Sequence, residues 1–518
     1  MSEALLPQSG KRAIFIKKEV KVFNGKHFVA GQWAIDLAGS PSIDVRFSSI
    51  NPSTEEEIGN FPFGKAGDID IAVNTAKDIF PQWRDTSRIK RADLFDNLSQ
   101  LLKRDHQKLV EAISLETGKS LNESHAEVIE SLHMCQVTAA MGRNAYGSIF
   151  GSELPTKDAR VFRKPKGVIG IISPWNFPLA IGSFWCAGPA LVEGNTVVHK
   201  PSELTPMVAQ MAAELYMEAG FPAGVYNLVH GDEVAGKALV RANVETILFT
   251  GSAEVGQEIR RHCADTWHKT CACEMGSKSA VITFEDGDMD LALDVSLASA
   301  FKLSGQRCVS SGRMLIEHSI FDEFVEEFVK RTGKVSVADP FTWTGKGLCY
   351  GPIISKAQMK RVEEFNQMVR DDSDATVLYD PEPGKGQGYF LNPFVYKIKW
   401  ADKSYLKKEV FGPHVALIPF DDIDDAIRIY NDTDYGLALG VVTDDFRKHR
   451  RLQNECYTGM LYINGGSIAA ESHLDFGGVK KSGNGWKSAV GTVDAVTEKI
   501  AVTTNYEKGK MSWAQGMK

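Results

Sequence analysis

The sequence has few cysteines for its length, eight in 518 residues, and their spacings are irregular. Disulfide-dependent secreted domains have dense, regularly spaced cysteines, so a disulfide framework is excluded and free thiols in a reducing compartment are expected. Residues 1–20 contain no apolar core long enough for a secretory signal peptide, which favours a cytoplasmic protein. The cysteines occupy positions 135, 186, 263, 271, 273, 308, 349 and 456.

Long apolar runs and clusters of one charge are also missing. The most apolar region, residues 168–198, is interrupted by "SPWNFP" and "AGP", which argues against a membrane-spanning helix. The 59 Lys and Arg and the 66 Asp and Glu are interspersed, with a net charge of −7, so a basic nucleic-acid-binding surface is not expected. His268, Cys271 and Cys273 lack a second pair at metal-ligand spacing, so no metal site is expected.

Short β-branched runs alternate with helical segments through much of the chain. The series between residues 168 and 250 predicts a parallel, doubly wound sheet, and a second series from residue 279 predicts another α/β domain. Two or three domains agree with the length, and apolar spacing predicts one further helix over residues 92–115. The predicted strands are 168–172, 196–200, 226–230, 246–250, 279–284, 313–317, 415–420 and 460–464, and the predicted helices are 206–220, 233–242 and 289–303.

Three residues from different segments suit covalent catalysis. Cys308 lies in "KLSGQRCVSSGR", although most cysteines are unreactive small apolar side chains, so its context has to decide. Glu274 stands among small and apolar residues, where desolvation gives a carboxyl group the raised pKa of a general base; the alternative is an ordinary interdomain carboxylate. Asn176, in "SPWNFP", offers a rigid amide donor for an oxyanion; the alternative is an asparagine that caps a turn.

Two strand ends suit a dinucleotide. Lys200 ends a predicted strand and Glu203 follows it, so the pair is placed to hold the hydroxyls of a ribose; the alternative is a solvated charge pair. In "FTGSAEVG" a strand passes through Gly251 and Ser252 into a helix containing Gly256, and a helix N-terminus reached in this way is suited to bind phosphate. The motif is not GxGxxG, and glycine turns between strand and helix are common, so neither signal decides alone.

The order of "PWNF", "HKPSE", "FTGS", "CEMGSK", "GQRC", "EVFGP" and "LDFGGVKKSGNG" resembles the NAD(P)-dependent aldehyde dehydrogenase superfamily, hydrolytic and non-acylating type. The similarity runs from about Phe23 to Tyr506. It implies that Cys308 is the nucleophile, that Glu274 is the general base, and that Asn176 stabilises the oxyanion together with the Cys308 N–H. It also implies NAD as cofactor, with NADP less favoured. The residues implied to bind this cofactor are Trp175, Lys200, Glu203, Gly231, Gly251, Ser252, Gly256, Glu409 and Phe411.

The resemblance further implies three structural parts and a homodimer or homotetramer. A dinucleotide-binding domain covers residues 1–146 and 167–276, and a catalytic domain covers 277–490. A small β extension, 147–166 and 491–518, supports the oligomer. The expected reaction converts an aldehyde to the acid through a thiohemiacetal and a thioester on Cys308. The alternatives are a relative that passes the acyl group to coenzyme A, which generally lacks the general base, and a non-enzymatic protein that keeps the fold.

The chain departs from the family pattern at two places. Ser277 in "EMGSK" stands where the family commonly has glycine, so the backbone there is expected to differ slightly. Trp486 and Lys487 follow "SGNG" where many members have Arg-Glu, so proton transfer would rest on Glu274 alone.

The substrate is expected to be polar. "GQRC", with Arg307 before the cysteine, also occurs in relatives that oxidise amino-acid-derived semialdehydes. The loop 465–475, expected to line the substrate tunnel, offers Ser467 and His473 and lacks an aromatic pair. Together these features favour a substrate such as glutamate semialdehyde, while the roles of Arg307 and of the pair Cys271 and Cys273 stay open.

Overall fold

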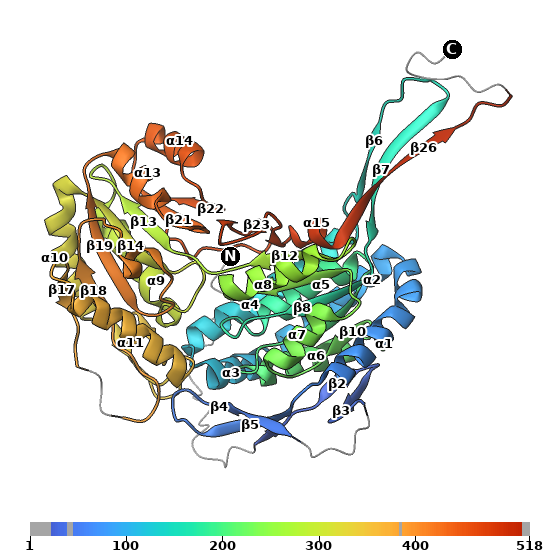
Figure 1. Cartoon of the computed structure of the whole chain (residues 1–518), viewed down its shortest axis with the longest axis horizontal. Helices are drawn as coiled ribbons and strands as arrows, with labels where there is room; N and C mark the ends of the chain where they lie inside the picture. Colours follow the sequence, from blue (N-terminus) through green and yellow to red (C-terminus); the bar gives the residue numbers. More distant parts are fainter. Residues whose placement is uncertain (1–21, 39–44, 383–385, 510–518) are drawn as a thin grey trace.

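Two seven-stranded sheets, each covered by helices, form the body of the protein in the computed structural model, which describes residues 22–38, 45–382 and 386–509 (Figure 1). Most neighbouring strands in both sheets are parallel, which confirms the α/β, doubly wound arrangement expected from the alternation of strands and helices. Expectations that concern residues 1–21, 39–44, 383–385 and 510–518, including the signal-peptide argument, lie outside the described residues.

The first sheet has the strand order β12-β11-β8-β9-β10-β2-β3. Strands β8 to β12 are parallel, and the β2–β3 hairpin adds an antiparallel edge. The strand order reverses between β8 and β11, and such a reversal opens a crevice at the carboxyl ends of these two strands. The strands are β2 (His27–Val29), β3 (Gln32–Ala34), β8 (Val168–Ile172), β9 (Thr196–Lys200), β10 (Tyr226–Leu228), β11 (Thr246–Thr250) and β12 (Thr270–Glu274).

Alternating residues of this sheet enter two separate cores. Ile169 and Ile171 of β8 face one core, whereas Val168 faces the other, as the pleat of a strand requires. One face is covered by α1 (Ala66–Asp85), α7 (Glu233–Arg241) and α8 (Ala253–Ala264), and the other by α5 (Ala187–Val192), α6 (Pro206–Glu218) and the π-helix Ile181–Cys186. Three long helices, α2 (Arg88–Arg104), α3 (His106–Thr117) and α4 (Leu121–Met141), pack against the second group.

The second sheet has the order β17-β18-β19-β14-β13-β21-β22, and only its edge strand β17 is antiparallel to its neighbour. Its strands are β13 (Ser279–Thr283), β14 (Ser311–Glu317), β17 (Thr376–Tyr379), β18 (Phe394–Lys397), β19 (His414–Phe420), β21 (Ala438–Val442) and β22 (Met460–Ile463). One face packs against α9 (Met289–Phe301) and α10 (Phe321–Thr332), and the other against α11 (Lys356–Arg370), α13 (Ile423–Asn431) and α14 (Phe446–Glu455).

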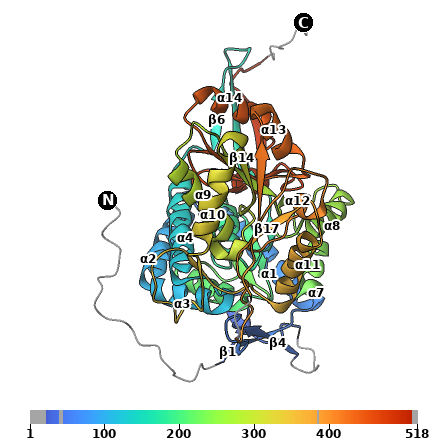
Figure 2. The same cartoon turned by 90° about the vertical axis from the view of Figure 1, so that its left-hand side faces the viewer.

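A three-stranded antiparallel sheet projects from the body as an arm, visible from the side in Figure 2 as well. Its strands β6 (Gly147–Phe150), β7 (Lys157–Pro165) and β26 (Thr497–Asn505) fall in the ranges proposed for the β extension. The remaining elements are short: β1 (Phe23–Asn24), β4 (Arg46–Ile50), β5 (Glu57–Pro62), β15 (Ser336–Val337), β16 (Cys349–Tyr350), α12 (Ser404–Lys407), β20 (Tyr435–Gly436), β23 (Asp475–Phe476), β24 (Val479–Lys480), β25 (Ser488–Ala489) and α15 (Thr492–Val496).

The prediction of one continuous helix over residues 92–115 is wrong. The chain leaves helical geometry at Asp105, where ψ is 12°, so that α2 ends at Arg104 and α3 begins at His106. The apolar periodicity continues across this break because both helices pack on the same core, and periodicity alone therefore does not reveal it. No helix among the described residues is long and apolar enough to cross a membrane.

Candidate active site

The crevice at the switch point between β8 and β11 brings the predicted segments together. β8 leads into residues 173–177, which carry Trp175 and Asn176, and β11 leads into the turn at Gly251. The indole of Trp175 packs edge to face on Phe411, with ring centroids 5.5 Å apart, so a segment that follows the first sheet contacts one from the second. The described residues hold no cluster of three or more His, Cys, Asp or Glu that suits a metal ion.

The loop before Cys308 has an unusual backbone. Leu303, Ser304 and Gly305 lie in the left-handed region, with φ of 54°, 55° and 69°. This geometry costs an ordinary L-residue about 1–2 kcal/mol, so tertiary contacts must hold it. The Ser304 hydroxyl donates to the Gly351 carbonyl at 2.7 Å, and the Gln306 amide oxygen accepts from the Ile354 N–H at 3.0 Å. A Cβ at Gly305 would lie 2.3 Å from the Gly412 carbonyl oxygen, which requires glycine there.

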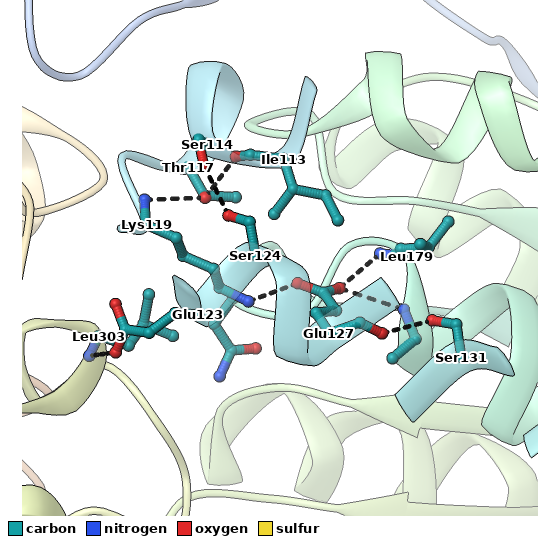
Figure 3. A network of polar contacts seen from close by, with 12 residues as sticks. Ile113, Ser114, Thr117, Lys119, Glu123, Ser124, Glu127, Ser131, Leu179 and Leu303 are labelled. Atoms are coloured by element: carbon teal, nitrogen blue, oxygen red, sulfur yellow. Dashed lines mark hydrogen bonds and ion pairs between the residues drawn. The ribbon is translucent and has the colours of Figure 1, made fainter. Parts of the chain in front are cut away.

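Two carboxylates of helix α4 hold the loops on either side of the crevice (Figure 3). Glu123 accepts a hydrogen bond from the backbone N–H of Leu303, in the left-handed turn. Glu127, one helical turn further on, accepts from the N–H groups of Leu179 and Ala180 at 2.8 and 3.2 Å, just after the Asn176 loop. Both loops are therefore fixed to the same face of one helix.

Because Glu127 is buried, its carboxylate needs a neighbouring cation to remain charged. Its side chain and that of Lys119 are fully buried and form an ion pair. The Lys119 ammonium also lies 3.8 Å from the centre of the Phe177 ring. Burial lowers the pKa of Lys119, and Glu127 acts against that shift. Removing either partner would leave an unpaired buried charge, which is strongly destabilising.

Cys308 lies at the end of this loop, partly accessible, while the other seven cysteines are buried. Burial of its thiol, with the nearby Glu409 and Glu274 carboxylates, raises its pKa to about 12, and Arg307 acts in the opposite direction. The backbone beside it is constrained, since the Asn176 amide nitrogen donates to the Gln306 carbonyl at 3.0 Å. In the free protein the thiol is therefore protonated near neutral pH, and ionising it requires added positive charge.

The Ser277 hydroxyl contacts the Cys308 loop directly. It donates to the carbonyl oxygen of Cys308 and lies 2.9 Å from the Ser279 hydroxyl. The Ser277 N–H donates to Glu409 at 2.7 Å. Burial raises the pKa of Glu409 to about 7. The Ser277 hydroxyl thus adds a side-chain contact that a glycine at this position would not make, while the expected slight change of the backbone stays a prediction.

Glu274 ends strand β12 and is only 6% exposed. Its Oε2 accepts from the Gly478 N–H at 3.2 Å, whereas its Oε1 has no hydrogen-bond partner within the described part of the chain. Burial raises its pKa well above the usual value, and Lys487 acts against that shift. A carboxylate with one free oxygen and a raised pKa is suited to take a proton from water.

The predicted ribose-binding pair lies at the carboxyl end of β9. Lys200 and Glu203 are 3.5 Å apart, and the Lys200 ammonium also donates to the Gly231 carbonyl at 2.9 Å. Gly231 has φ of 150°, and a Cβ there would meet that of Ala235 at 2.6 Å. Lys200 and Glu203 line a pocket of about 300 Å³ whose walls include Ile172, Val255 and Ile259.

The predicted phosphate turn has the expected strand–turn–helix geometry. Ser252 is the N-cap of α8, and its hydroxyl accepts from the Val255 N–H at 3.3 Å. A Cβ at Gly256 would lie 2.3 Å from the sulfur of Met275, so glycine allows the helix to approach β12 closely. The free N–H groups of this helix start are at the carboxyl end of β11, where an anion is stabilised by them.

A cavity of about 1020 Å³ opens beside Arg307, the residue that precedes Cys308. It is lined by charged groups of both signs, among them Arg307, Lys302, Glu130 and Glu471, and by His473. Ser467 does not take the expected place in this wall, because it is buried and its hydroxyl contacts the Val309 carbonyl and Ser311.

Sequence reasoning missed the roles of Lys119, Glu123 and Glu127 and the hydroxyl contact of Ser277. "SLNE" at residues 120–123 matches a capping box, which the structure contains, so it signals the start of α4. Nothing local in that motif signals the contact of Glu123 with Leu303, 180 residues later. Arg307, whose role was left open, lies 3.8 Å from Glu123 and stacks over Phe177.

Comparison with known proteins gives consistent matches over nearly the whole chain. The model of the Aldehyde dehydrogenase family matches residues 40–502. Betaine aldehyde dehydrogenase of Bacillus subtilis (strain 168) is 32% identical over 493 residues, which cover 94% of this chain and 98% of that protein. Mitochondrial succinate-semialdehyde dehydrogenase of Arabidopsis thaliana is 34% identical over 459 residues, 88% of this chain and 85% of that protein. The structure of betaine aldehyde dehydrogenase from Staphylococcus aureus in complex with NAD+ superimposes with a TM-score of 0.88 at 27% identity, covering 96% of this chain and 98% of that chain.

The contact of Glu123 with the left-handed turn gives the first prediction. Glu123→Ala leaves the buried N–H of Leu303 without an acceptor, and we expect the free energy of unfolding to fall by about 1–3 kcal/mol. The loosened loop should also expose Cys308, so iodoacetamide should alkylate it faster, as measured by peptide mass spectrometry. Glu123→Gln, which keeps an acceptor oxygen, should change both quantities less, and Glu326→Gln on the exposed face of α10 is the control. Unchanged stability and labelling in Glu123→Ala would contradict the assigned role.

Proposed function

The chain belongs to the aldehyde dehydrogenase family, and we propose from this premise that it oxidises an aldehyde to the carboxylic acid with NAD, by the hydrolytic route through Cys308. The observation that carries the proposal is that three separate segments lie close together. Asn176 is hydrogen-bonded to the Cys308 loop, and Glu274 is near enough to raise the pKa of the Cys308 thiol. None of the three side chains is needed to build the sheets.

The described residues fit a dinucleotide. The pocket beside Lys200 and Glu203 has apolar walls for an adenosine and a carboxylate for ribose hydroxyls, and the N-terminus of α8 suits a pyrophosphate. Trp175, Phe411 and Glu409 are proposed to hold the nicotinamide end. When bound, NAD supplies the hydride acceptor and a positive charge close to the thiol.

The mechanism starts from the protonated thiol of Cys308. Loss of its proton gives the thiolate, which attacks the aldehyde carbon and forms a thiohemiacetal. The developing oxyanion is stabilised by the Cys308 N–H and by the Asn176 amide, which has a second N–H besides the one bonded to Gln306; one such donor is typically worth about 3 kcal/mol. After hydride transfer the acyl group remains as a thioester. Glu274 takes a proton from water, the resulting hydroxide adds to the thioester carbon, and the thiolate leaves.

Two alternatives are less well supported. Transfer of the acyl group to coenzyme A would not need Glu274, yet this residue is present with one oxygen free to accept a proton. A non-enzymatic role would not explain the buried carboxylates around Cys308, which oppose its ionisation and are costly to bury.

We further propose a homodimer or homotetramer in a reducing, cytoplasmic compartment. All eight cysteines are unpaired. The projecting arm, proposed as the oligomerisation extension, exposes apolar side chains, and Ile149 on β6 is 88% exposed. The boundaries given above for the dinucleotide-binding and catalytic domains are part of the same proposal.

The proposed substrate class is an amino-acid-derived semialdehyde such as glutamate semialdehyde. Such a molecule carries an ammonium and a carboxylate, and the cavity beside Arg307 offers this residue and Lys302 as well as Glu130 and Glu471. Burial raises the pKa of Glu130 to about 7, and Arg307 and Lys119 act against that shift, so Glu130 is partly ionised near neutral pH. This mixed lining suits a zwitterion better than a purely aliphatic chain.

The substrate proposal predicts a specific change in KM. Glu130→Gln should raise KM for glutamate semialdehyde about tenfold, which corresponds to about 1.4 kcal/mol, because it removes a partner for the ammonium group. KM for succinate semialdehyde and propionaldehyde, which lack that group, should change little. Steady-state kinetics with the three aldehydes and with betaine aldehyde measures this, with Glu326→Gln as the control. A higher kcat/KM for betaine aldehyde or propionaldehyde than for the semialdehydes would refute the proposed class.

The two half-reactions give a third prediction. Glu274→Gln should release close to one equivalent of NADH rapidly and then stall, with a thioester visible by intact mass spectrometry, because only water activation is lost. Cys308→Ser should show no NADH burst while NAD binding, measured by calorimetry, persists. Multiple turnovers by Glu274→Gln, or oxidation by Cys308→Ser at an unchanged rate, would be incompatible with the mechanism. Acceleration by coenzyme A would favour the acylating alternative.

Cofactor choice gives a fourth prediction. If Glu203 accepts hydrogen bonds from the ribose, the 2′-phosphate of NADP would face its carboxylate, and like charges about 4 Å apart repel by about 4 kcal/mol at an effective dielectric of 20. Lys200, 3.5 Å from Glu203, offsets part of this. We expect a preference for NAD of roughly tenfold to a few hundredfold, and Glu203→Ser should narrow it mainly by improving NADP. The ratio of kcat/KM values for the two cofactors measures this, and equal use of both by the unmodified enzyme would remove the role of Glu203.

A further inference from the structure

The peptide group between Gly477 and Gly478 connects Glu274 to Lys487. Its N–H, on Gly478, donates to Oε2 of Glu274 at 3.2 Å, and its carbonyl oxygen, on Gly477, accepts from the Lys487 ammonium at 3.0 Å. The same ammonium lies 3.5 Å from the carbonyl oxygen of Gly478. One peptide unit thus has a cation at its oxygen and a carboxylate at its N–H.

Because this peptide is trans, the Lys487 ammonium, the peptide dipole and the Glu274 carboxylate are aligned. The described residues contain no cis peptide bond, so the C=O and N–H of this unit point in opposite directions, with Lys487 on one side and Glu274 on the other. A cation at the carbonyl oxygen polarises the amide and makes its N–H a stronger donor, because hydrogen bonds in a chain strengthen one another in a low-dielectric interior. The carboxylate form of Glu274 gains more from this donor than the neutral acid does.

The packing around this peptide is tight. A Cβ at Gly477 would lie 2.4 Å from Oε1 of Glu274 and 2.8 Å from Cδ of Lys487, so both side chains contact this glycine. The strands on either side, β23 and β25, pair with each other and hold residues 475–489 as a closed loop. The peptide is therefore held between its two partners by direct side-chain contact, within a loop whose ends are paired.

Lys487 is the charged group that faces Glu274. Among the described residues, the thiols of Cys186, on the π-helix that packs against β25, and of Cys308 are further titratable groups near Glu274. Burial is the main reason that both have a pKa of about 12, so both are neutral in the physiological range. Burial pushes the pKa of Glu274 upward, and Lys487 is the largest influence against it, followed by the N–H of Gly478.

We propose that Lys487 is a positioning residue for thioester hydrolysis: acting through the Gly477–Gly478 peptide, its ammonium keeps the Glu274 carboxylate ionised. The proposal rests on the role of Glu274 as general base given above. It assigns a purpose to a lysine at a position where the resemblance led us to expect an acidic residue. Lys487 does not exchange a proton with substrate; it sets the pH above which Glu274 is ready to take one from water.

The test measures hydrolysis of the acyl-enzyme directly. p-Nitrophenyl acetate, added in the presence of NAD, acetylates Cys308 without hydride transfer, and the decay of the acetyl-enzyme is followed by rapid quenching and intact mass spectrometry between pH 5 and 9. In Lys487→Met the acid limb of the decay rate should move upward by about one pH unit, with decay about tenfold slower on that limb. The plateau at high pH should be unchanged, since Glu274 is ionised there in both proteins. A purely structural effect would lower the plateau and the melting temperature instead.

Three further variants make the outcome decisive. Lys487→Arg keeps the charge and should keep the position of the acid limb, while Lys487→Gln keeps a donor without charge and should give an intermediate shift. Lys481→Met removes the same charge from an exposed lysine of the same loop, which pairs with Asp434, and should leave the limb in place. An unmoved acid limb in Lys487→Met, with hydrolysis still lost in Glu274→Gln, overturns the role of Lys487 alone. Hydrolysis retained in Glu274→Gln overturns the general base itself.

Discussion

The first two turns of helix α4 are the part of this structure on which the site depends most. Glu123 fixes the left-handed turn that leads to Cys308, and Glu127 fixes the backbone that follows Asn176 (Figure 3). Those two loops adjoin different sheets, and no strand or helix connects them directly. A buried lysine, Lys119, compensates the charge of Glu127. The relative position of Cys308 and Asn176 is therefore constrained by two carboxylates spaced one helical turn apart, together with the hydrogen bond from Asn176 to the Gln306 carbonyl.

Burial of Cys308 explains why we expect its thiol to be unreactive before the cofactor binds. Desolvation keeps the thiol protonated and pushes the Glu274 and Glu409 carboxyl groups toward their neutral forms. Each proposed step then requires a nearby positive charge. The bound cofactor would supply it for ionisation of the thiol, and Lys487 would supply it for the proposed general base, Glu274. In the proposed mechanism, reaction thus depends on the chain or its ligands to supply that charge, and a protonated thiol in the free enzyme would be less reactive toward alkylating agents and oxidants.

The sequence was sufficient for those features that depend on local patterns. Strands β8, β9 and β11 match the predicted ranges because their β-branched residues are buried on both faces and bounded by glycine or proline. The break at Asp105 was missed because α2 and α3 share one core and hence one apolar stripe. The roles given to Cys308, Glu274 and Asn176 rested on the order of motifs and stay predictions, although Asn176 is hydrogen-bonded to the residue two before Cys308 and the Glu274 carboxylate influences the Cys308 thiol. Glu123 and Ser277 could not be found, because their contacts join residues 180 and 31 positions apart.

The pairing of β26 with β7 has a consequence for how the molecule is made. Thr497 contacts Arg163 across 334 positions of sequence, and Phe476, Ala489 and Val496 complete the same core as the early helices α2 to α6. At about 5–20 residues per second of synthesis, the ribosome takes on the order of twenty seconds to a minute to supply these partners. During that interval the nascent amino-terminal half exposes part of its apolar core and the free edge of β7. The segment synthesised first would therefore need a chaperone that shields apolar surface for the longest time.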